Sequence, residues 1–297
     1  MALRLIVTRP AAQAVDWVHQ LAAHGLQAQA LPLLGIEPLD DPAPLHAAWQ
    51  TLAGCKLAVF VSPNAVQHFF AHAPACNWPP AVLAGSTGPG TTRALRQAGL
   101  REEQIVEPSA EAAQFDTEAL WARLQAMSWA GASVLVVRGE NGRDWLANVL
   151  RQQGAEVNFI AAYRRTPPQL DPAGRALLAD ACSQPAQHLW LFSSSEALAC
   201  LRVLAPAADW SQSRALASHP RIVQVARELG FGWVQLTAPT VQAVALSAAG
   251  QASVELSSVV STAVSTVVGA GVNAAVNPDV RVAAPGPEGP SIQLPDL

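Results

Sequence analysis

Two stretches of the chain, RLIVTRPAAQAVDWVHQLAAHGLQAQALP (residues 4–32) and SVLVVRGENGRDWLANVLRQQGAEVNFIA (residues 133–161), decide the fold because they repeat one pattern. Each begins with a short apolar run, continues with helically spaced apolar residues, passes a glycine and resumes with a second apolar run. The glycines, Gly25 and Gly154, lie 129 positions apart. The pattern predicts a strand, a helix and a second strand in each stretch.

Two further pairs of stretches repeat at nearly the same spacing. KLAVFVSPNAVQHF (residues 56–69) matches HLWLFSSSEALACL (residues 188–201) at a spacing of 132. TTRALRQAGL (residues 91–100) matches IVQVARELGF (residues 222–231) at a spacing of 131. Three matches in the same order indicate a duplicated α/β unit. Because strand-like runs alternate with helix-like segments, we expect parallel sheets covered by helices.

The composition is that of a globular chain with ample core material. Of its 297 residues 51% are hydrophobic and 13% are charged, and the net charge is −4. A chain of this length has room for two domains, and the acidic balance argues against a nucleic-acid partner. The cysteines form no CxxC pair, and the apolar run at the N-terminus is too short for a signal peptide. We therefore expect a cytoplasmic protein.

The last part of the chain, residues 250–297, has a different composition, without aromatic residues and with Pro and Gly concentrated toward its end. Residues 256–276 carry no charge over 21 positions, which is long enough to span a bilayer. The run is built mostly from Ser, Thr, Gly, Ala and Val, however, and these insert poorly. We expect a disordered low-complexity tail rather than a membrane span.

A glycine-rich stretch, AGSTGPGTTRAL (residues 84–95), follows one predicted strand and opens a helix. Such a turn presents backbone N–H groups to an anion, which makes Gly88 and Thr91 candidate ligand contacts. A plain strand-to-helix turn explains the stretch equally well. It does not predict a nucleotide site, because no GK[ST] follows and the glycines are not spaced as GxGxxG.

Two serine turns occupy equivalent places in the repeat, with Ser62 and Pro63 in one half and Ser193, Ser194 and Ser195 in the other. Each favours the role of N-cap for the helix that follows. Ligands of open parallel sheets bind at the carboxyl ends of the strands, however, where a hydroxyl and free amides also suit a carboxylate. Neither turn has the GxSxG pattern of many serine hydrolases.

Arg9 and Arg138 each stand at the carboxyl end of a predicted strand, again at equivalent places in the repeat. Arginine suits the capture of carboxylates and phosphates, so both are candidates for binding an anionic ligand, together with the adjacent Gly139. The alternative for this region is a structural salt bridge, for example between Arg143 and Glu140.

His68, His72 and Cys76 are spaced by four residues, which would place possible metal ligands on one helix face. Pro74 is expected to end that helix before the cysteine, and no acidic ligand is near. We therefore favour a structural role for these residues.

Tyr163, in FIAAYRRTPP (residues 159–168), is the only tyrosine of the chain. A buried tyrosine needs a partner for its hydroxyl. The same hydroxyl can act as a neutral acid that helps a leaving group depart. The residues alone favour the structural role.

In their order and spacing, these stretches resemble the uroporphyrinogen-III synthase family over residues 1 to about 249. The stretches that carry the resemblance are LIVTRP, VFVSPNAV, GPGTTRAL, FDTEAL, VLVVRGENGRDWLANVLRQQGAEV, AYRRT, LFSSSEAL and HPRIVQVARELGF. The resemblance implies two flavodoxin-like parallel-sheet domains joined by two extended linkers, near residues 32–38 and 164–168. Prolines at both places fit such linkers, and Tyr163 would then face the cleft at the hinge. Arg164 and Arg165 beside it could then contact a carboxylate, and the sequence leaves open which of the two points inward.

The domain prediction follows from this resemblance. One domain is expected to be discontinuous, with residues 1–35 and 169–249. Residues 36–168, linkers included, are expected to form the inserted domain, and residues 250–297 the tail.

The resemblance also implies a cofactor-independent lyase of heme biosynthesis. Members of the family close hydroxymethylbilane, a linear tetrapyrrole polycarboxylate, into uroporphyrinogen III. The reaction loses water and inverts the last pyrrole ring through a spiro intermediate, whereas spontaneous closure gives the type I isomer. By this resemblance Tyr163 assists the departing hydroxyl. The residues expected to bind substrate are Arg9, Ser62, Pro63, Gly88, Thr91, Arg138, Gly139, Ser193, Ser194, Ser195 and His219.

One turn departs from the family pattern. The family's Gly-Pro-x-Thr reads His219-Pro220-Arg221-Ile222 here, so Ile222 stands at the threonine position. A hydroxyl contact is then lost, or replaced by His219 or Arg221. We further expect a monomer that acts on a small molecule, with no metal, organic cofactor, nucleic-acid partner or membrane partner. The alternative is a two-domain cleft protein that binds an anionic ligand without catalysis.

Overall fold

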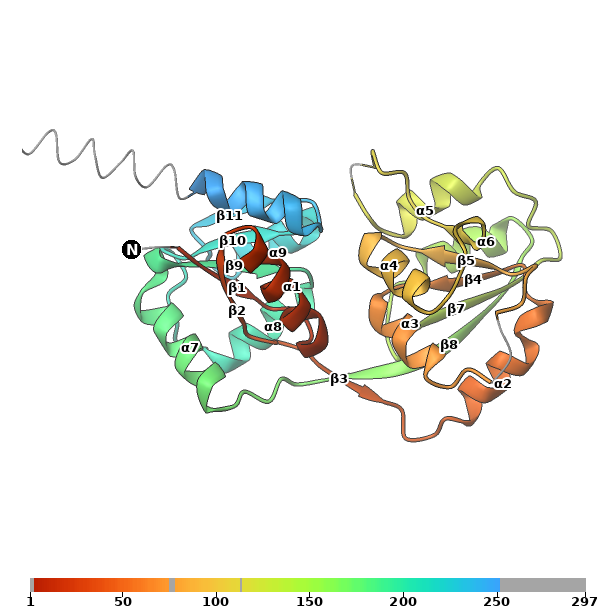
Figure 1. The fold of residues 1–297 in the computed structure, drawn as a ribbon, viewed down its shortest axis with the longest axis horizontal. Helices are drawn as coiled ribbons and strands as arrows, with labels where there is room; N and C mark the ends of the chain where they lie inside the picture. Colours follow the sequence, from red (N-terminus) through yellow and green to blue (C-terminus); the bar gives the residue numbers. More distant parts are fainter. Residues whose placement is uncertain (1–2, 75–77, 113, 252–297) are drawn as a thin grey trace, which may run out of the picture. The chain divides into compact units, whose positions relative to one another are not determined.

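The computed structural model describes residues 3–74, 78–112 and 114–251, and its strands form two separate sheets (Figure 1). The first sheet has the strand order β11-β10-β9-β1-β2, with parallel pairing throughout. Its strands are β1 (Arg4–Val7), β2 (Gln27–Ala30), β9 (His188–Phe192), β10 (Arg214–Ala217) and β11 (Trp233–Leu236).

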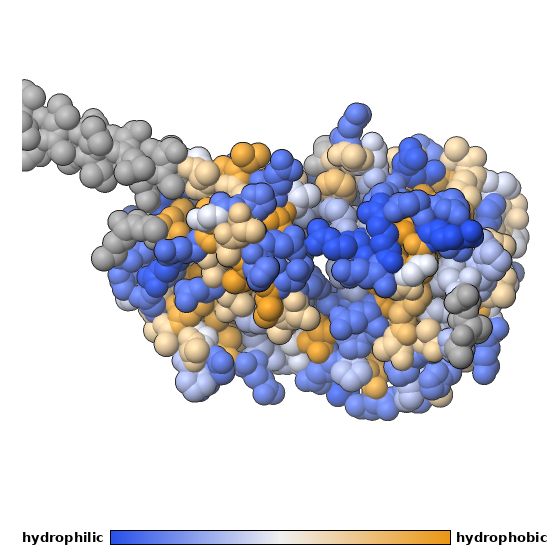
Figure 2. All heavy atoms as spheres, in the orientation of Figure 1, coloured by the Kyte–Doolittle hydropathy of each residue, from blue (hydrophilic) through white to orange (hydrophobic). Residues whose placement is uncertain are grey.

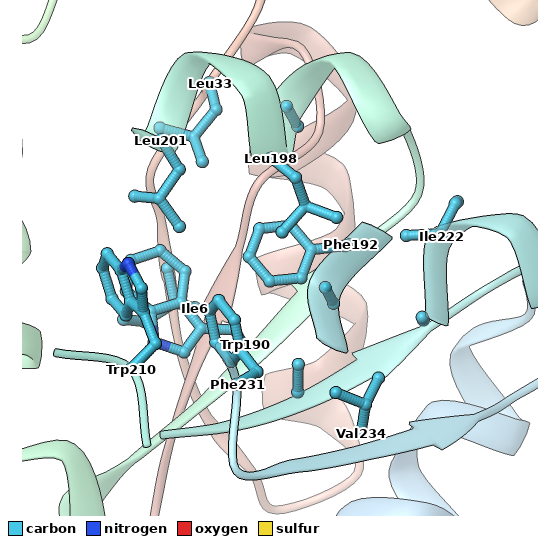
Figure 3. Close-up of a cluster of buried hydrophobic side chains, with 14 of the residues drawn as sticks. Ile6, Leu33, Trp190, Phe192, Leu198, Leu201, Trp210, Ile222, Phe231 and Val234 are labelled. Atoms are coloured by element: carbon cyan, nitrogen blue, oxygen red, sulfur yellow. The ribbon is translucent and has the colours of Figure 1, made fainter. Parts of the chain in front are cut away.

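Helices cover both faces of the first sheet because its strands direct apolar side chains to both faces in turn. In β9, Trp190 and Phe192 pack in the cluster of Figure 3, while Leu189 and Leu191 pack on the opposite face. The helices on the first face are α7 (Pro172–Ser183), α8 (Ser195–Leu204) and α9 (Pro220–Glu228). On the opposite face lie α1 (Ala11–Ala23) and a helix over residues 241–251.

The second sheet has the order β3-β8-β7-β4-β5-β6. Its pairs are parallel except for β3 with β8, which is antiparallel. Its strands are β3 (Gly35–Pro38), β4 (Leu57–Phe60), β5 (Leu83–Ser86), β6 (Ile105–Val106), β7 (Ser133–Gly139) and β8 (Glu156–Thr166).

The second sheet is likewise covered on both faces. One face packs against α2 (Ala43–Thr51), α3 (Pro63–Phe70) and α4 (Pro89–Gln97), and the other against α5 (Thr117–Leu124) and α6 (Trp145–Gln152). Short 3-10 turns lie at Leu52–Gly54, Glu102–Gln104 and Pro185–Gln187. These parallel sheets with helices on both faces confirm the predicted α/β architecture.

The chain passes between the two sheets along a paired ribbon. We expected two extended linkers near residues 32–38 and 164–168. Both are extended, but β8 continues to Thr166, and Gly35 to Pro38 pair with it in antiparallel register. A Cβ atom at Gly35 would collide with the Thr166 hydroxyl, so a larger residue here would force the Thr166 side chain to move. The linkers therefore stabilise each other through backbone hydrogen bonds.

Several expectations for the chain ends and the surface lie partly outside the described residues. The predicted tail from residue 250 begins inside the 241–251 helix, and its remainder, including the charge-free run 256–276, falls outside the described residues. Within residues 3–74, 78–112 and 114–251, no helix has the length and apolarity to cross a bilayer.

Hydrophilic and hydrophobic residues are interspersed over the face shown in Figure 2. The exact domain boundaries stay a prediction.

Candidate functional site

A bulge in β8 directs the side chain of Tyr163. Arg138 of β7 pairs with Ala161, whereas the next residue, Gly139, pairs with Tyr163, so Ala162 is the extra residue. Before the bulge, odd-numbered residues such as Phe159 pack on the α5–α6 face; after it, Tyr163 packs on the α2–α4 face. One extra residue reverses the alternation of a strand. The bulge therefore carries the phenol to the face where α3 begins.

Two polar groups contact the Tyr163 hydroxyl although the side chain is buried, with 1% exposure. The Ser62 hydroxyl lies 3.1 Å from it, and the Arg165 guanidinium donates to it through Nη2 at 3.3 Å. The ring of His68 lies 5.8 Å from the phenol ring, centroid to centroid. Burial removes competing water, so the orientation of this hydroxyl is set by these neighbours.

Gly139 makes room for the phenol. A Cβ atom at this position would lie 3.1 Å from Cε2 and 3.2 Å from Cζ of Tyr163. The structure thus places Gly139, predicted to bind substrate, against the ring of Tyr163.

The serine turn after β4 supplies the first partner of the phenol. Ser62 has extended backbone geometry and its hydroxyl accepts the Ala65 N–H at 3.1 Å, as the N-cap of α3. Pro63 takes the first helical position, which suits its fixed φ. The N-cap role expected for Ser62 is confirmed, and the same hydroxyl also contacts Tyr163.

The glycine-rich turn after β5 lies beside this serine turn. Gly88 is the N-cap of α4, and the Ser86 hydroxyl accepts its N–H and donates to its carbonyl. Thr91 is buried in the first turn of α4, with 3% exposure. A Cβ atom at Gly90 would lie 3.4 Å from the Pro63 ring, so the two helix starts are neighbours. The structure thus brings Gly88 and Thr91 into the neighbourhood of the Ser62 turn.

Arg138 and Arg143 form salt bridges. Arg138 pairs with Asp144 at 2.5 Å, and its guanidinium carbon lies 4.0 Å from the Phe159 ring centroid. Arg143 pairs with Glu118 at 2.6 Å, so the example of Glu140 as its partner was wrong. Burial raises the pKa of Glu118, but its hydrogen bonds from Arg143 and Thr117 outweigh burial and hold the pKa at about 2.

Arg9 lies at the end of β1 in a half-buried position. Its guanidinium stacks on Trp17 at 4.1 Å and contacts Gln13 at 3.4 Å. Its Nε atom is buried and has no hydrogen-bond partner within the described part of the chain. Burial, together with the nearby Arg93, lowers the pKa of Arg9 to about 10, so it stays cationic at neutral pH.

The second serine turn, after β9, connects to Tyr163 through Arg165. Ser194 is the N-cap of α8 and accepts the N–H of Glu196, while Ser195 is the first residue of the helix. The Glu196 carboxylate pairs with Arg165 at 3.1 Å. The turn that contains Ser193 to Ser195 is thus linked to the phenol through one ion pair.

His219 and Ile222 belong to the turn that differs from the family's Gly-Pro-x-Thr pattern. Nδ1 of His219 accepts the N–H of Arg221, which makes the imidazole the N-cap of α9. The other ring nitrogen is 3.5 Å from Asp116, the N-cap residue of α5. Ile222 is 5% exposed and belongs to the apolar cluster of Figure 3. The threonine position of the family is therefore part of the hydrophobic core here.

Sequence reasoning missed three residues of this region, Glu196, Gln13 and Asn64, and left open whether Arg164 or Arg165 points toward the site. Gln13 donates to Asn64 at 2.9 Å, which joins α1 to the start of α3. Arg165 lies two residues after Tyr163 in a strand, so strand periodicity alone places the two on one face. For the three missed residues the sequence offers no signal, because their partners are far away along the chain.

A cavity of about 970 Å³ is lined by residues 10–12, residues 29–37, α3 and residues 166–177. Of the described residues that line it, His68 also contacts Tyr163, and the charged ones, Glu37 and Asp171, are both acidic. Acidic groups repel a polycarboxylate. No arginine is among the described residues that line this cavity. We therefore place the candidate site at Arg165 and Ser62.

His68 lies in the last turn of α3, and His72 follows that helix. His68 and His72 are both described, but Cys76 lies outside the described residues. Among the residues that the structure describes, no three His, Cys, Asp or Glu side chains are grouped as a metal ion would require. Burial, and secondly the neighbouring His72, lowers the pKa of His68, which favours a neutral imidazole beside the phenol.

Comparison with known proteins agrees with the resemblance seen in the sequence. Residues 15–245 match the family described as "Uroporphyrinogen-III synthase HemD". The chain is 28% identical to the uroporphyrinogen-III synthase of Salmonella typhimurium over 242 residues, which covers 77% of this chain and 92% of that protein. It is 27% identical to that of Escherichia coli over 237 residues, with the same coverage.

A solved structure shows the same fold. A mutant uroporphyrinogen III synthase of Thermus thermophilus superposes with a TM-score of 0.52 at 17% identity, covering 86% of this chain and all of that one. The likeness shows that the two chains share a fold with two α/β domains. Since the family match covers most of the sequence, the chain belongs to the uroporphyrinogen-III synthase family.

Proposed function

We propose that the chain closes hydroxymethylbilane into uroporphyrinogen III at the cluster around Tyr163. Membership of the family makes the chain a cyclising lyase of tetrapyrrole biosynthesis and favours this reading over a binding protein without catalysis. The observation that carries the assignment of the site is the buried phenol with two polar partners, Ser62 and Arg165. A phenol held in this way is a directed hydrogen-bond donor.

In the proposed reaction Tyr163 donates its proton to the hydroxyl that leaves the substrate as water. Binding depends on the groups that lie around the phenol, since a flexible polycarboxylate has to be folded before its ends can react. Arginine side chains and the amides at the starts of α3, α4, α8 and α9 suit its carboxylates. We propose the predicted set for this role: Arg9, Ser62, Pro63, Gly88, Thr91, Arg138, Gly139, Ser193, Ser194, Ser195 and His219.

Three finer expectations stay predictions: a monomer, a cytoplasmic location and no nucleic-acid partner. The net charge of −4 supports the last of these. The described cysteines Cys55, Cys182 and Cys200 are free thiols, which supports a reducing compartment.

The variant Tyr163→Phe tests the proposed role of the phenol. We expect kcat to fall at least about 100-fold, because general-acid assistance typically contributes that much. The loss of hydrogen bonds should lower the free energy of unfolding by about 1 kcal/mol. Product analysis by isomer and chemical denaturation measure the two effects.

Trp49→Phe is the matched control for Tyr163→Phe. Its indole N–H donates to the Phe69 carbonyl at 2.9 Å in the same apolar cluster, so the variant also loses a buried hydrogen bond. It should destabilise the protein and leave kcat unchanged. An unaltered kcat in Tyr163→Phe would show that the phenol does not take part in the reaction.

A further inference from the structure

We propose that Arg165 is the positioning residue for the Tyr163 hydroxyl and stabilises the charge that forms on the phenolic oxygen when its proton leaves. This inference rests on the proposed function, because it assigns a role within the same site. Tyr163 and Arg165 are two residues apart in β8, beyond the bulge, so both side chains lie on one face of the strand.

The guanidinium of Arg165 is held in a fixed orientation. Its Nε and Nη1 atoms each lie 3.1 Å from a carboxylate oxygen of Glu196. Nη1 also donates to the Asn141 carbonyl at 3.4 Å. The two-point contact with Glu196 sets the plane of the guanidinium and leaves Nη2 to donate to the phenol at 3.3 Å.

The hydrogen-bonding capacity of these groups determines where the phenolic proton points. An arginine only donates, so the oxygen of Tyr163 accepts from Arg165. The oxygen of Ser62 already accepts the Ala65 N–H, and its own proton is free to be donated to the phenol. When both neighbours donate, the proton of Tyr163 is left for a third group. The substrate hydroxyl is that group in the proposed reaction.

The same two donors stabilise the step that follows. The C–O bond of the substrate's hydroxymethyl group breaks, its electron pair stays on the oxygen, and this oxygen takes the Tyr163 proton to leave as water. The phenolic oxygen then carries negative charge, which the Arg165 guanidinium and the Ser62 hydroxyl offset. The proton that the substrate loses when the ring closes returns to Tyr163, so the net change is the loss of one water.

Arg164 offers a matched comparison within the same strand. It is adjacent in sequence but directed to the opposite face, where it pairs with Glu37 at 3.2 Å and with Asp40 at 2.7 Å. It has the same charge and the same kind of ion pair as Arg165. It lacks the contact with the phenol, so its replacement measures what the loss of a strand arginine does by itself.

The test is a double-mutant cycle on the full-length chain, with Arg165→Gln, Tyr163→Phe and the pair combined. We expect Arg165→Gln to lower kcat about 100- to 1,000-fold, as the loss of one donor to a developing oxyanion does. KM should change by less than about threefold. In the Tyr163→Phe background, Arg165→Gln should cause no further loss of kcat, because the oxygen through which it acts is gone.

Two further variants keep the result specific. Arg165→Lys retains a charged donor and should recover part of the lost kcat, which a purely structural role for the guanidinium would not predict. Arg164→Gln should leave kcat within about twofold of the wild type.

The inference is overturned by unchanged kcat in Arg165→Gln, or by an equal loss of kcat in the presence and absence of the phenol. It is also overturned by a loss confined to KM. These outcomes are separate from failure of the proposed function, since that would appear as a wild-type protein that forms no type III isomer. A wild type that forms it, with an impaired Tyr163→Phe and a fully active Arg165→Gln, removes only the role of Arg165.

Discussion

The position of the Tyr163 phenol depends on the bulge in β8, which sets the face of the sheet on which the side chain lies. Without the bulge between β7 and β8, the alternation of the strand would direct Tyr163 to the α5–α6 face, away from Ser62. The sequence predicts the strand and singles out the tyrosine, since it is unique in the chain. It does not predict the bulge, because a one-residue change of register leaves no mark in the hydrophobic pattern.

Gly139→Ala tests how closely the phenol must be placed. The added methyl would lie 3.1 Å from Cε2 of Tyr163, so the ring has to shift by a few tenths of an ångström. We expect kcat to fall about tenfold through misplacement of the hydroxyl, and overpacking to lower the free energy of unfolding by about 1 kcal/mol. Steady-state kinetics and denaturant unfolding give the two values.

Gly54→Ala is the control for this substitution. A Cβ atom at Gly54 meets nothing within 4 Å, so the variant should keep its kcat and its stability. If Gly139→Ala also kept its full kcat, the ring of Tyr163 would not need the position that the structure gives it.

At the scale of elements, some of the helix starts around the site were readable from the sequence. The sequence predicted N-caps at the two serine turns, and Ser62 and Ser194 cap α3 and α8. The structure adds His219-Pro220 and Asp171-Pro172, where a capping side chain is followed by proline at the first helical position. The sequence did not predict the pairing of β3 with β8. Gly35 and Thr166 are far apart along the chain, and prolines on both sides suggested isolated linkers.

The start of α5 provides a pH-dependent contribution to stability. The pKa of Glu118 is about 2 in the folded protein and 4.5 in an unstructured chain. Because folding lowers this pKa, the ion pair with Arg143 stabilises the protein above pH 4.5, and the contribution is lost as the pH falls toward 2. Both side chains are about 40% exposed, so solvent screening limits the contribution to about 1 kcal/mol or less.

Glu118→Gln should therefore reduce the free energy of unfolding at pH 7 and have a smaller effect as the pH falls below 4.5. Denaturant unfolding at several pH values measures the difference from the wild type. Arg143→Gln should show the same trend, and combining the two variants should add little, because they remove one interaction. An effect of Glu118→Gln that did not change with pH would contradict the ion pair as its source.

For the whole molecule, the internal repeat predicted two α/β units, and the two sheets have the expected parallel cores. The repeat could not show that the two serine turns differ in how they contact Tyr163. Ser62 contacts Tyr163 directly, whereas the turn at Ser194 reaches it through Glu196 and Arg165. That difference arises because the chain has a single tyrosine, in one half of the repeat.

The central claim is that this chain directs ring closure of a linear tetrapyrrole. Its most direct test supplies hydroxymethylbilane to the purified full-length protein and separates the uroporphyrinogen isomers. We expect the type III isomer in large excess, because the enzyme positions the inverted ring before closure. A product mixture dominated by the type I isomer, as in the reaction without protein, would contradict the claim.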